Sequence, residues 1–331
     1  MFKFAHVNAT TVADAATTLG KGKAQVLAGG TDLMPYMKGM FTPNPPDTLV
    51  NIKNIAPSLD YIKADAGTLK IGALTSLTDI ASSSIVSGGW NALAMAAKAV
   101  GGPELRNMGT IGGNICQKPR CLYYRNEFNN FSCLRKDSKG SCFALVGVNT
   151  YHSIFGAVGG CIAVCPSDTA PALVALGASI VTNKKTWAAA DFFVLNMTAT
   201  DATREQINAL AADEIVTEIQ VPALAAGTKS TYMKFAFRKA IDFPLVSAAV
   251  VVTSAAGTVS KASIVLGGVY NSPKRATDAE TSITGKAVTT ATADAAGAAT
   301  ASVATPTALP ANKYKVQIAK TMIKRALLAS I

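Results

Sequence analysis

The chain has 331 residues, of which 49% are hydrophobic and 15% are charged. This balance excludes an intrinsically disordered protein, and the length favours two or three domains over one. The formal net charge of +11 comes from basic residues scattered along the chain, so it does not indicate a nucleic-acid-binding protein. The surplus is compatible with an anionic cofactor or an acidic partner subunit.

The N-terminus and one apolar stretch bear on the compartment. MFKFAHVNATTVADAA lacks the basic region and apolar run of a secretory signal. Residues 154–181 carry a single charge, Asp168, but two prolines and four glycines interrupt them. A buried strand and helix at 158–178 explain this stretch better than a membrane span. We therefore predict no membrane span.

The first 52 residues predict a small α/β unit. FKFAHV is a candidate strand, a helix is expected from Thr11, and residues 24–39 fit a strand, a glycine turn and a helix. DTLVNIKNI at 47–55 closes this unit as a further strand.

A second α/β region is predicted for residues 53–224. It starts with a hairpin that turns at Ala66-Gly67, followed by a helix, and WNALAMAAKAVGG forms a helix that ends at a glycine pair. A boundary is expected near residue 225, after the link from Pro222 to Gly227.

Residues 225–331 predict strands followed by helices. Residues 228–253 and KASIVLGGV supply the strands, and the Ala- and Thr-rich stretch 285–310 fits a weakly encoded surface helix. A last helix from about Asn312 has an apolar stripe at Tyr314, Ile318, Met322 and Ala326, with lysines on the other face. The predicted fold class is α+β.

Two glycine loops are candidate phosphate sites. AGGTDL at 28–33 and GTIGGN at 109–114 each lie beside a predicted strand, and their backbone N–H groups could cradle an anion. A single such loop is more often a plain tight turn, whereas two suit the two phosphates of a dinucleotide. Neither loop has the G-x-G-x-x-G spacing, so we expect a dinucleotide bound in another manner, with FAD favoured over NAD.

An ordered set of motifs carries a family resemblance. In chain order they are LAGGTDLMPYMK, IGALTSLTDI, RNMGTIGGNI, PSDTAPALVAL, YMKFAFRKAIDFPLVSAAV, IVLGGV with SPKRATDAE, and KYKVQIAKTMIKRALL. Together they resemble the FAD-binding subunit of the molybdenum hydroxylases, which include xanthine dehydrogenase, carbon monoxide dehydrogenase and aldehyde oxidoreductases. The resemblance covers nearly the whole chain. It implies a two-part FAD-binding α/β region and a C-terminal domain of a small antiparallel sheet and helices.

The resemblance also implies the cofactor-binding residues. The first loop would line the FAD pyrophosphate, the second would form another nest, Asp168 would face sugar-like hydroxyls, and the remaining three would lie near the isoalloxazine. The implied residues are Ala28, Gly29, Gly30, Thr31, Asp32, Leu33, Thr110, Gly112, Gly113, Asn114, Asp168, Lys234, Asp242 and Phe243.

Two of these residues have ordinary structural alternatives. A lone carboxylate in an apolar stretch needs hydrogen-bond donors, but Asp168 could also be the N-cap of a helix at 169–178. Phe243 could belong to the hydrophobic core, which is the usual place of a Phe before PLVSAAV.

Six cysteines fall within 50 residues of one another, in a segment that has neither helical nor strand periodicity. Disulfides usually serve small secreted domains, and zinc sites favour two close pairs of cysteines, whereas the spacings here are mostly long. An iron–sulfur cluster needs four thiolates, which scattered positions can supply, and it would hold together a long irregular segment. All three interpretations remain open from the residues alone.

The resemblance favours the iron–sulfur interpretation. A subset of the family, which includes aldehyde oxidoreductase and 4-hydroxybenzoyl-CoA reductase subunits, carries a 4Fe–4S insertion at about residues 116–161. Its pattern corresponds to RCLYY, CLRK, GSC and CIAVCPSD, which implies Cys121, Cys133, Cys142 and Cys161 as ligands. Cys116 and Cys165 are expected to be buried thiols, although Cys165 lies close enough to Cys161 to replace it. Tyr123 and Tyr124 would shield the sulfurs or pack the loop.

The implied function is electron transfer within a larger enzyme. A molybdopterin-binding large subunit would hydroxylate the substrate, in aldehyde or related oxidation, and a small 2Fe–2S subunit would pass electrons to FAD. The electrons would then pass from FAD to oxygen, ferredoxin, a quinone or NAD.

Alternatives to this function are a self-sufficient flavin oxidoreductase with a structural metal, a hydroxybenzoyl-CoA-reductase-like subunit, and a binding subunit without FAD. No catalytic residue is predicted in this chain. The expected compartment is the cytoplasm, or the periplasm after export with a partner.

Overall fold

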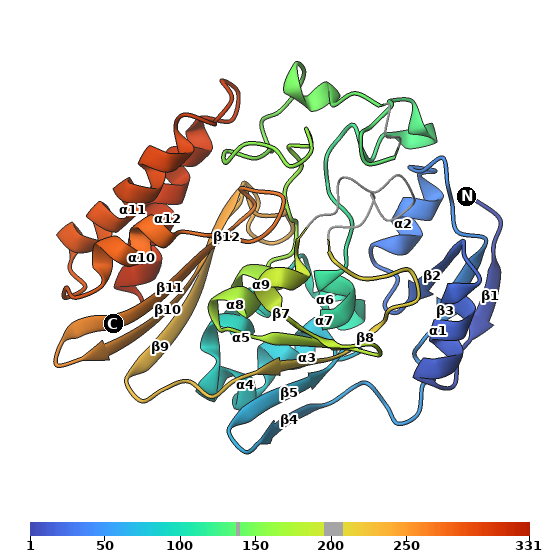
Figure 1. Cartoon of the computed structure of the whole chain (residues 1–331), viewed down its shortest axis with the longest axis horizontal. Coiled ribbons are helices and arrows are strands. Elements are labelled where there is room, and N and C mark those ends of the chain that lie inside the picture. The colour runs from blue at the N-terminus through green and yellow to red at the C-terminus, as the bar shows by residue number, and fades with distance from the viewer. Residues whose placement is uncertain (137–139, 195–207) are drawn as a thin grey trace.

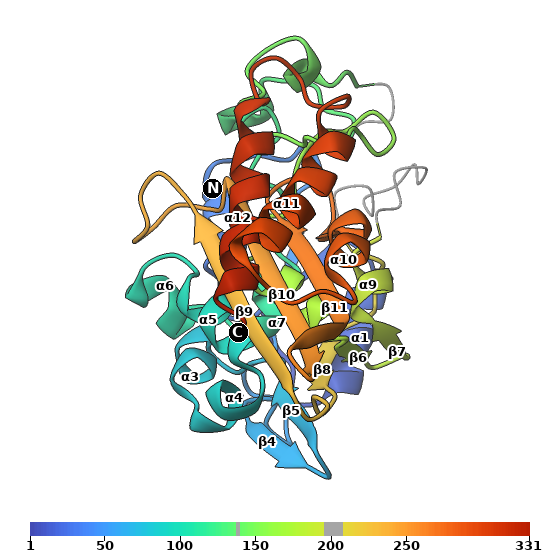
Figure 2. The same ribbon diagram turned by 90° about the vertical axis from the view of Figure 1, so that its left-hand side faces the viewer.

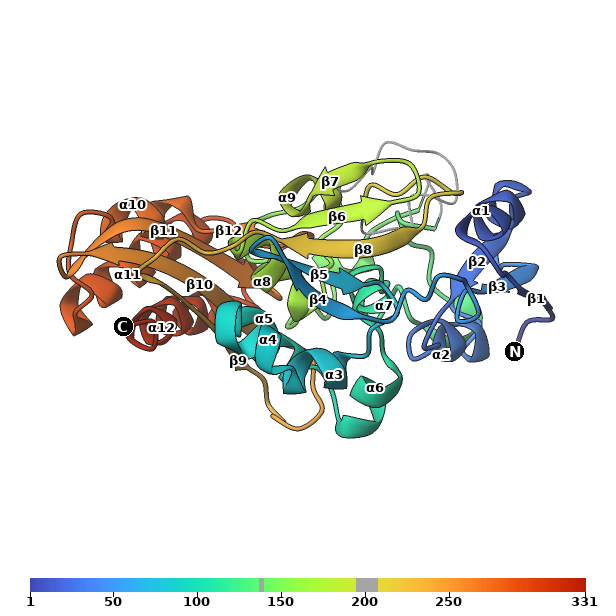
Figure 3. The same cartoon turned by 90° about the horizontal axis from the view of Figure 1, so that it is seen from below.

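The structure is a computed structural model and describes residues 1–136, 140–194 and 208–331. Three sheets with their helices follow one another along the molecule (Figures 1 and 3). The long irregular connection between α7 and α8, drawn mostly in green, runs across the upper part of Figure 1. The mixed fold and the C-terminal antiparallel sheet with helices confirm the predicted fold class.

The first unit is a parallel three-stranded sheet with the strand order β1-β3-β2. Thr11 caps the helix α1 by accepting a hydrogen bond from the backbone N–H of Asp14, so the helix begins where the sequence predicts. Leu19 of α1 packs with Val50 in a small core. The elements are β1 (Ala5–Asn8), α1 (Val12–Gly20), β2 (Ala24–Leu27), α2 (Leu33–Lys38) and β3 (Thr48–Asn51).

The second unit is an antiparallel five-stranded sheet with the order β4-β5-β8-β6-β7. The predicted hairpin turns at Ala66 and Gly67, which have φ angles of 46° and 78°. The strands are β4 (Ile62–Asp65), β5 (Thr68–Gly72), β6 (Ser179–Thr182), β7 (Thr186–Ala188) and β8 (Val216–Val221). The helices are α3 (Leu77–Ser82), α4 (Ser84–Gly89), α5 (Asn91–Lys98), α6 (Pro103–Met108), α7 (Ile111–Ile115), α8 (Thr169–Ala175) and α9 (Ala189–Phe192).

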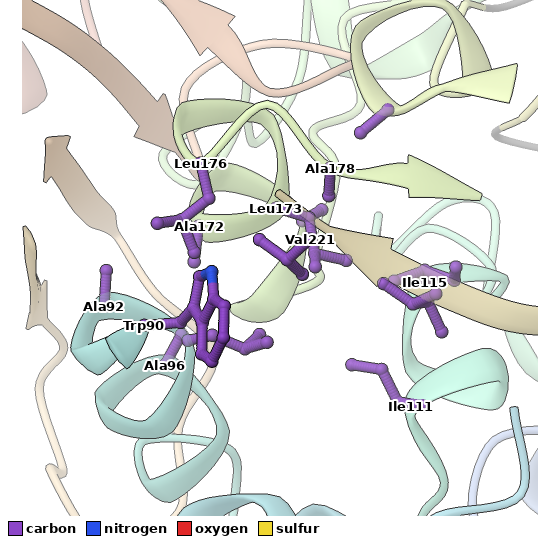
Figure 4. Close-up of a cluster of buried hydrophobic side chains, with 14 of the residues drawn as sticks. Trp90, Ala92, Ala96, Ile111, Ile115, Ala172, Leu173, Leu176, Ala178 and Val221 are labelled. Atoms are coloured by element: carbon purple, nitrogen blue, oxygen red, sulfur yellow. The ribbon is translucent and has the colours of Figure 1, made fainter. Parts of the chain in front are cut away.

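The main core lies where these helices meet the second sheet (Figure 4). Trp90, at the start of α5, packs its ring among Ala96, Ala172 and Val221, and its indole N–H donates to the carbonyl of Pro222 at 2.7 Å. Small alanines on α5 and α8 allow these helices to approach the strands β9 to β11 of the C-terminal sheet closely. α7 also packs against α8, and Ser167, just before α8, donates to Asn114 of α7 at 2.6 Å.

The C-terminal unit is an antiparallel sheet with the order β12-β11-β10-β9. Helices α10 to α12 cover one face (Figure 2), whereas α5 and α8 pack on the other. Alternate residues of β10 therefore enter different cores, which explains the continuous apolar run VSAAVVV. The elements are β9 (Thr228–Phe235), β10 (Val246–Ala255), β11 (Thr258–Gly267), β12 (Lys274–Arg275), α10 (Thr277–Ile283), α11 (Thr290–Ala304) and α12 (Tyr314–Leu328).

The predicted helix in 285–310 is present as α11, but the predicted stripe of α12 is partly wrong. Tyr314 is 37% exposed, whereas Lys315 is fully buried and donates to the carbonyls of Tyr151, His152 and Gly268. Burial lowers the pKa of Lys315 to about 7. A lysine can occupy the inner face because three carbonyl oxygens satisfy its ammonium group.

The predicted strand before α8 is also wrong. Residues 161–168 are buried but irregular, with an isolated bridge between Val158 and Cys161. Gly159 and Gly160 have φ angles of 53° and 80°, which interrupt an extended strand. The backbone of this segment makes its hydrogen bonds with residues of other loops instead. For example, the Cys165 N–H donates to the carbonyl of Tyr270 at 2.9 Å.

The predicted irregular segment has only two short 3₁₀ turns in its described part, at Glu127–Asn129 and Phe143–Leu145. In the described ranges, no helix combines the length and apolarity that crossing a bilayer would need.

Candidate functional site

A cleft of about 650 Å³ opens between the first two units and the edge of the C-terminal sheet. It is lined by the two glycine loops, the start of the cysteine segment, the loop before α8, Lys234 of β9 and the turn at 241–243. The structure brings all fourteen residues that the resemblance implied to this one cleft.

The two glycine loops touch each other in the cleft. A Cβ on Gly29 would overlap the carbonyl oxygen of Met108, directly before the second loop, so only glycine allows this approach. Gly30 has a φ angle of 73°, and Thr110 accepts a hydrogen bond from the N–H of Gly113 at 3.1 Å. The Gly112 N–H also donates within the protein, to the carbonyl of Ala73 at 2.9 Å, so the second loop brings small residues close to the space that the first loop lines.

Asp32 joins the first loop to the cysteine segment. Its carboxylate lies 2.7 Å from an Nη atom of Arg120 and 2.6 Å from one of Arg125, and it accepts the Lys118 N–H at 2.8 Å. Burial raises the pKa of Asp32, but the two guanidinium groups outweigh burial and hold it below its ordinary value. Asp32 is therefore an anchor that remains charged in the folded protein.

This pairing predicts a specific pH dependence for Asp32→Asn. Because the folded-state pKa of Asp32 is lowered, its contribution to stability is present above the unfolded pKa of about 4 and is lost as pH falls through the folded value. We expect the variant to be less stable at pH 7 by about 1–3 kcal/mol, with the difference shrinking below about pH 4. Urea unfolding of both proteins between pH 3 and 7 measures this, and a constant difference would contradict the assignment.

Asp168 is fully buried and pairs with two groups of β9. It accepts hydrogen bonds from the Tyr232 hydroxyl at 2.5 Å and from Lys234 Nζ at 2.8 Å. Burial raises the pKa of Asp168, although Lys234 opposes this, and burial together with Asp168 raises that of Tyr232. Asp168 occupies the N-cap position of α8, as the alternative predicted, but its side chain makes no cap bond and Ser167 accepts the Ala170 N–H instead.

Asn114 ties the second glycine loop to the loop before α8. Its side-chain oxygen accepts hydrogen bonds from Ser167 at 2.6 Å and from Thr169 at 2.7 Å. These hydroxyls are buried, so they hold Asn114 in one orientation at the cleft wall.

The turn at 241–243 forms the outer rim of the cleft. Asp242 accepts a forked pair of bonds from the exposed Arg238, and Phe243 is 42% exposed. The core alternative for Phe243 is therefore wrong. The Arg120 guanidinium lies 4.5 Å from the centre of the Phe243 ring, which connects the rim to the cysteine segment.

The four cysteines that the resemblance implied as ligands line a second, small cavity. Cys121, Cys133, Cys142 and Cys161 surround it together with Tyr123, Tyr124, Arg135 and His152. Of the other two cysteines, Cys116 lines the cleft and Cys165 lies in the main core. All six are free thiols.

Backbone and side-chain donors point to these thiols. Burial raises the pKa of Cys121, Cys133 and Cys142, and nearby backbone N–H groups partly oppose it: those of Tyr123 and Tyr124 at Cys121, that of Arg135 at Cys133, and those of Ala144, Leu145 and Ile162 at Cys142. Arg135 Nε lies 3.3 Å from Cys161 Sγ, and His152 Nε2 lies 3.2 Å from Cys121 Sγ. Burial raises the pKa of Cys121 to about 11, so this site favours a neutral thiol until a cation binds.

The cavity does not have the form of a single-ion site. Among residues 1–136, 140–194 and 208–331, no three His, Cys, Asp or Glu side chains converge to hold one metal ion. The space between the thiols is about 20 Å³, room for roughly one water molecule. A larger group would require the surrounding side chains to move apart.

The cleft and the cavity are neighbours. Tyr36 lines the cleft and Tyr124 lines the cavity, and their hydroxyl oxygens are 3.2 Å apart with ring centres 5.9 Å apart. Arg135 lines both spaces. One wall, which includes these three buried side chains, therefore separates them.

Family models match both parts of the chain. Residues 2–224 match the FAD-binding domain in molybdopterin dehydrogenase, and residues 230–330 match the CO dehydrogenase flavoprotein C-terminal domain. The chain belongs to the FAD-binding subunits of the molybdenum hydroxylases. This confirms the resemblance and makes the chain an oxidoreductase subunit.

Individual relatives of this FAD-binding subunit span most of its length. It is 32% identical to the aldehyde oxidoreductase FAD-binding subunit PaoB of Escherichia coli K12, over 87% of this chain and 89% of that protein. It is 30% identical to the carbon monoxide dehydrogenase medium chain of Hydrogenophaga pseudoflava, over 96% and 94%. The solved carbon monoxide dehydrogenase of H. pseudoflava superposes with a TM-score of 0.75 at 29% identity, covering 99% of this chain and 97% of that one.

Sequence reasoning missed several residues that shape the cleft of this flavoprotein subunit. Arg120, Arg125 and Lys118 hold Asp32, while Tyr232 and Ser167 order the loop before α8. Tyr232 could have been found, because it lies two residues before Lys234 on the same strand and so faces the same side. No sequence pattern near Asp32 indicates that it pairs with the cysteine segment.

Proposed function

We propose that this subunit binds FAD in the cleft and a 4Fe–4S cluster between Cys121, Cys133, Cys142 and Cys161. It would pass electrons from a molybdopterin-binding subunit and a 2Fe–2S subunit to an external acceptor. The observation that carries the proposal is the convergence of two groups far apart in sequence. Both glycine loops meet at one cleft, and the four thiols line one cavity beside it.

The cleft suits a dinucleotide in its chemistry. The first glycine loop can offer N–H groups to phosphate oxygens, whereas the Gly112 and Gly113 N–H groups donate within the protein and the second loop allows close approach. The proposed contacts are Gly29, Gly30, Thr31, Gly112 and Gly113. Asp168 is positioned by Tyr232 and Lys234 and would accept bonds from sugar-like hydroxyls. Lys234, Asp242 and Phe243 would surround the ring end, where Phe243 supplies an apolar wall.

The four cysteines that line the cavity are a ligand set that a 4Fe–4S cluster uses. Four cysteines ligate a 4Fe–4S cluster, each through a different iron, so the sulfurs surround a volume rather than a point. Backbone N–H groups that point at ligand sulfurs are among the features that tune such clusters. Loading requires the four thiols to separate from their present spacing.

When bound, the two cofactors supply the electron-transfer chemistry. The chain's own residues bind and orient them: Asp32 fixes the first loop to the cysteine segment, and Asn114 fixes the second loop to α8. Buried Tyr36 and Tyr124 keep water out of the wall between the two sites. No side chain is required to act as an acid or a base.

Aldehyde oxidation is the proposed reaction of the whole complex. The similarity to the PaoB aldehyde oxidoreductase subunit supports it, as does 28% identity over 86% of this chain to the glyceraldehyde dehydrogenase medium chain of Sulfolobus acidocaldarius. Oxygen, ferredoxin, a quinone and NAD remain the candidate acceptors. We further propose domain boundaries at 52/53 and 224/225, which follow the grouping of strands into three sheets.

Purification of the chain with and without its partner subunits tests the proposal. We expect about one FAD per chain, with four iron and four sulfide, and aldehyde oxidation only when both partners are present. Absence of flavin would overturn the cleft assignment. Zinc in place of iron would overturn the cluster assignment, and activity of the chain alone would support a self-sufficient oxidoreductase.

A further inference from the structure

We propose that Arg135 sets the reduction potential of the cluster, acting as a positioning residue in the wall between the cysteine cavity and the flavin cleft. The inference rests on the proposed 4Fe–4S site. It assigns a role to a side chain that is neither a ligand nor one of the fourteen residues proposed for the flavin.

Arg135 contacts one of the four proposed ligands and follows a second closely in sequence. Its side-chain Nε lies 3.3 Å from Cys161 Sγ, and it lies two residues after Cys133. The residue is 1% exposed, so its donors are fixed by packing rather than shared with bulk water. A guanidinium group in this position makes charge-assisted hydrogen bonds to a thiolate ligand.

The same side chain also reaches the other site. Arg135 is among the residues that line both the cysteine cavity and the flavin cleft. Its positive charge therefore lies in the wall that electrons would cross, where low dielectric makes a charge act more strongly than it does at the surface.

Other cations of the segment are engaged differently. Arg120 and Arg125 pair with Asp32, which offsets part of their charge. Lys136 donates to Asn129 and lies 5.0 Å from the ring centre of Tyr124. The Arg135 side chain donates to the sulfur of a proposed ligand, Cys161.

The sign of the effect follows from charge. Reduction adds an electron to a cluster whose thiolate ligands already make it anionic, and a nearby positive donor stabilises the reduced form more than the oxidised form. Removing the charge should therefore lower the reduction potential. A substitution that keeps the positive charge but changes the geometry of the donor should lower the reduction potential less than one that removes the charge.

The test compares Arg135→Gln, Arg135→Lys and a matched control, Arg275→Gln, in the protein co-expressed with its partners. Arg275 pairs with Glu280 at the far edge of the C-terminal sheet and lines neither space. Iron, sulfide and FAD contents are measured first, and the cluster potential is then measured by a redox titration followed by electron paramagnetic resonance. This readout is independent of turnover.

We expect Arg135→Gln to change the ratio of reduced to oxidised cluster by about tenfold at a fixed potential, a shift of about 59 mV to lower values. Arg135→Lys should give a smaller shift, and Arg275→Gln should give none. If Arg135→Gln assembles no cluster, Arg135→Lys provides the test. A cluster potential in Arg135→Lys equal to that of the wild type then overturns the inference. Unchanged potentials in both variants also overturn it while leaving the cluster proposal intact. A wild-type protein without iron overturns the cluster proposal itself.

Discussion

Replacing Cys133 with Ser is expected to remove iron and acid-labile sulfide from the protein together. Cys133 lines the small cavity with three other thiols, and a cluster needs all four thiolates. We expect iron to fall from about four per chain to near zero, while FAD stays near one per chain because Cys133 does not line the cleft. Metal analysis, sulfide assay and flavin absorbance on the same sample provide the measurement.

Cys165→Ala is the matched control for this loss. Cys165 lies four residues after Cys161 but packs into the main core, outside the cavity. We expect it to retain iron and to lose only about 1 kcal/mol of unfolding free energy. Retention of iron in Cys161→Ser together with its loss in Cys165→Ala would show that Cys165 is the fourth ligand.

Gly29→Ala is expected to prevent stoichiometric FAD binding. The added Cβ would overlap the carbonyl oxygen of Met108, and both groups are backbone-fixed, so the two glycine loops must separate. We expect a loss of about 1–3 kcal/mol in unfolding free energy and at least about tenfold weaker FAD binding. Flavin content after purification and titration of the apoprotein with FAD measure the two effects.

Gly88→Ala provides the control for this change. Gly88 lies in α4, where an added Cβ would meet no heavy atom within 4 Å, and its φ is not in the left-handed region. Since alanine favours helix, the variant should be as stable as the wild type or slightly more so, with normal FAD content. Normal FAD binding by Gly29→Ala would contradict the paired-loop arrangement.

Much of the fold follows from local patterns. The hairpin at Ala66-Gly67, the cap at Thr11 and the helix at 290–304 depend on turn chemistry, capping and propensity, which act over a few residues. The failures have a common cause. Residues 161–168 look like a strand because they are apolar, yet their hydrogen bonds go to loops distant in sequence. Lys315 is expected to be exposed because it is charged. It is nevertheless buried, because three carbonyl oxygens distant in sequence accept hydrogen bonds from its ammonium group.

By itself, the amino-acid sequence determined many of the elements, the two glycine loops and the cluster of cysteines with its family pattern. These are local properties, set by backbone freedom, periodicity and residue type. Only the tertiary structure decided that Asp32 is held by Arg120 and Arg125, that Asp168 pairs with β9 rather than capping α8, and that Arg135 lies between the two spaces. Each of these contacts joins groups whose positions depend on how separate units pack, and no short-range pattern encodes that packing.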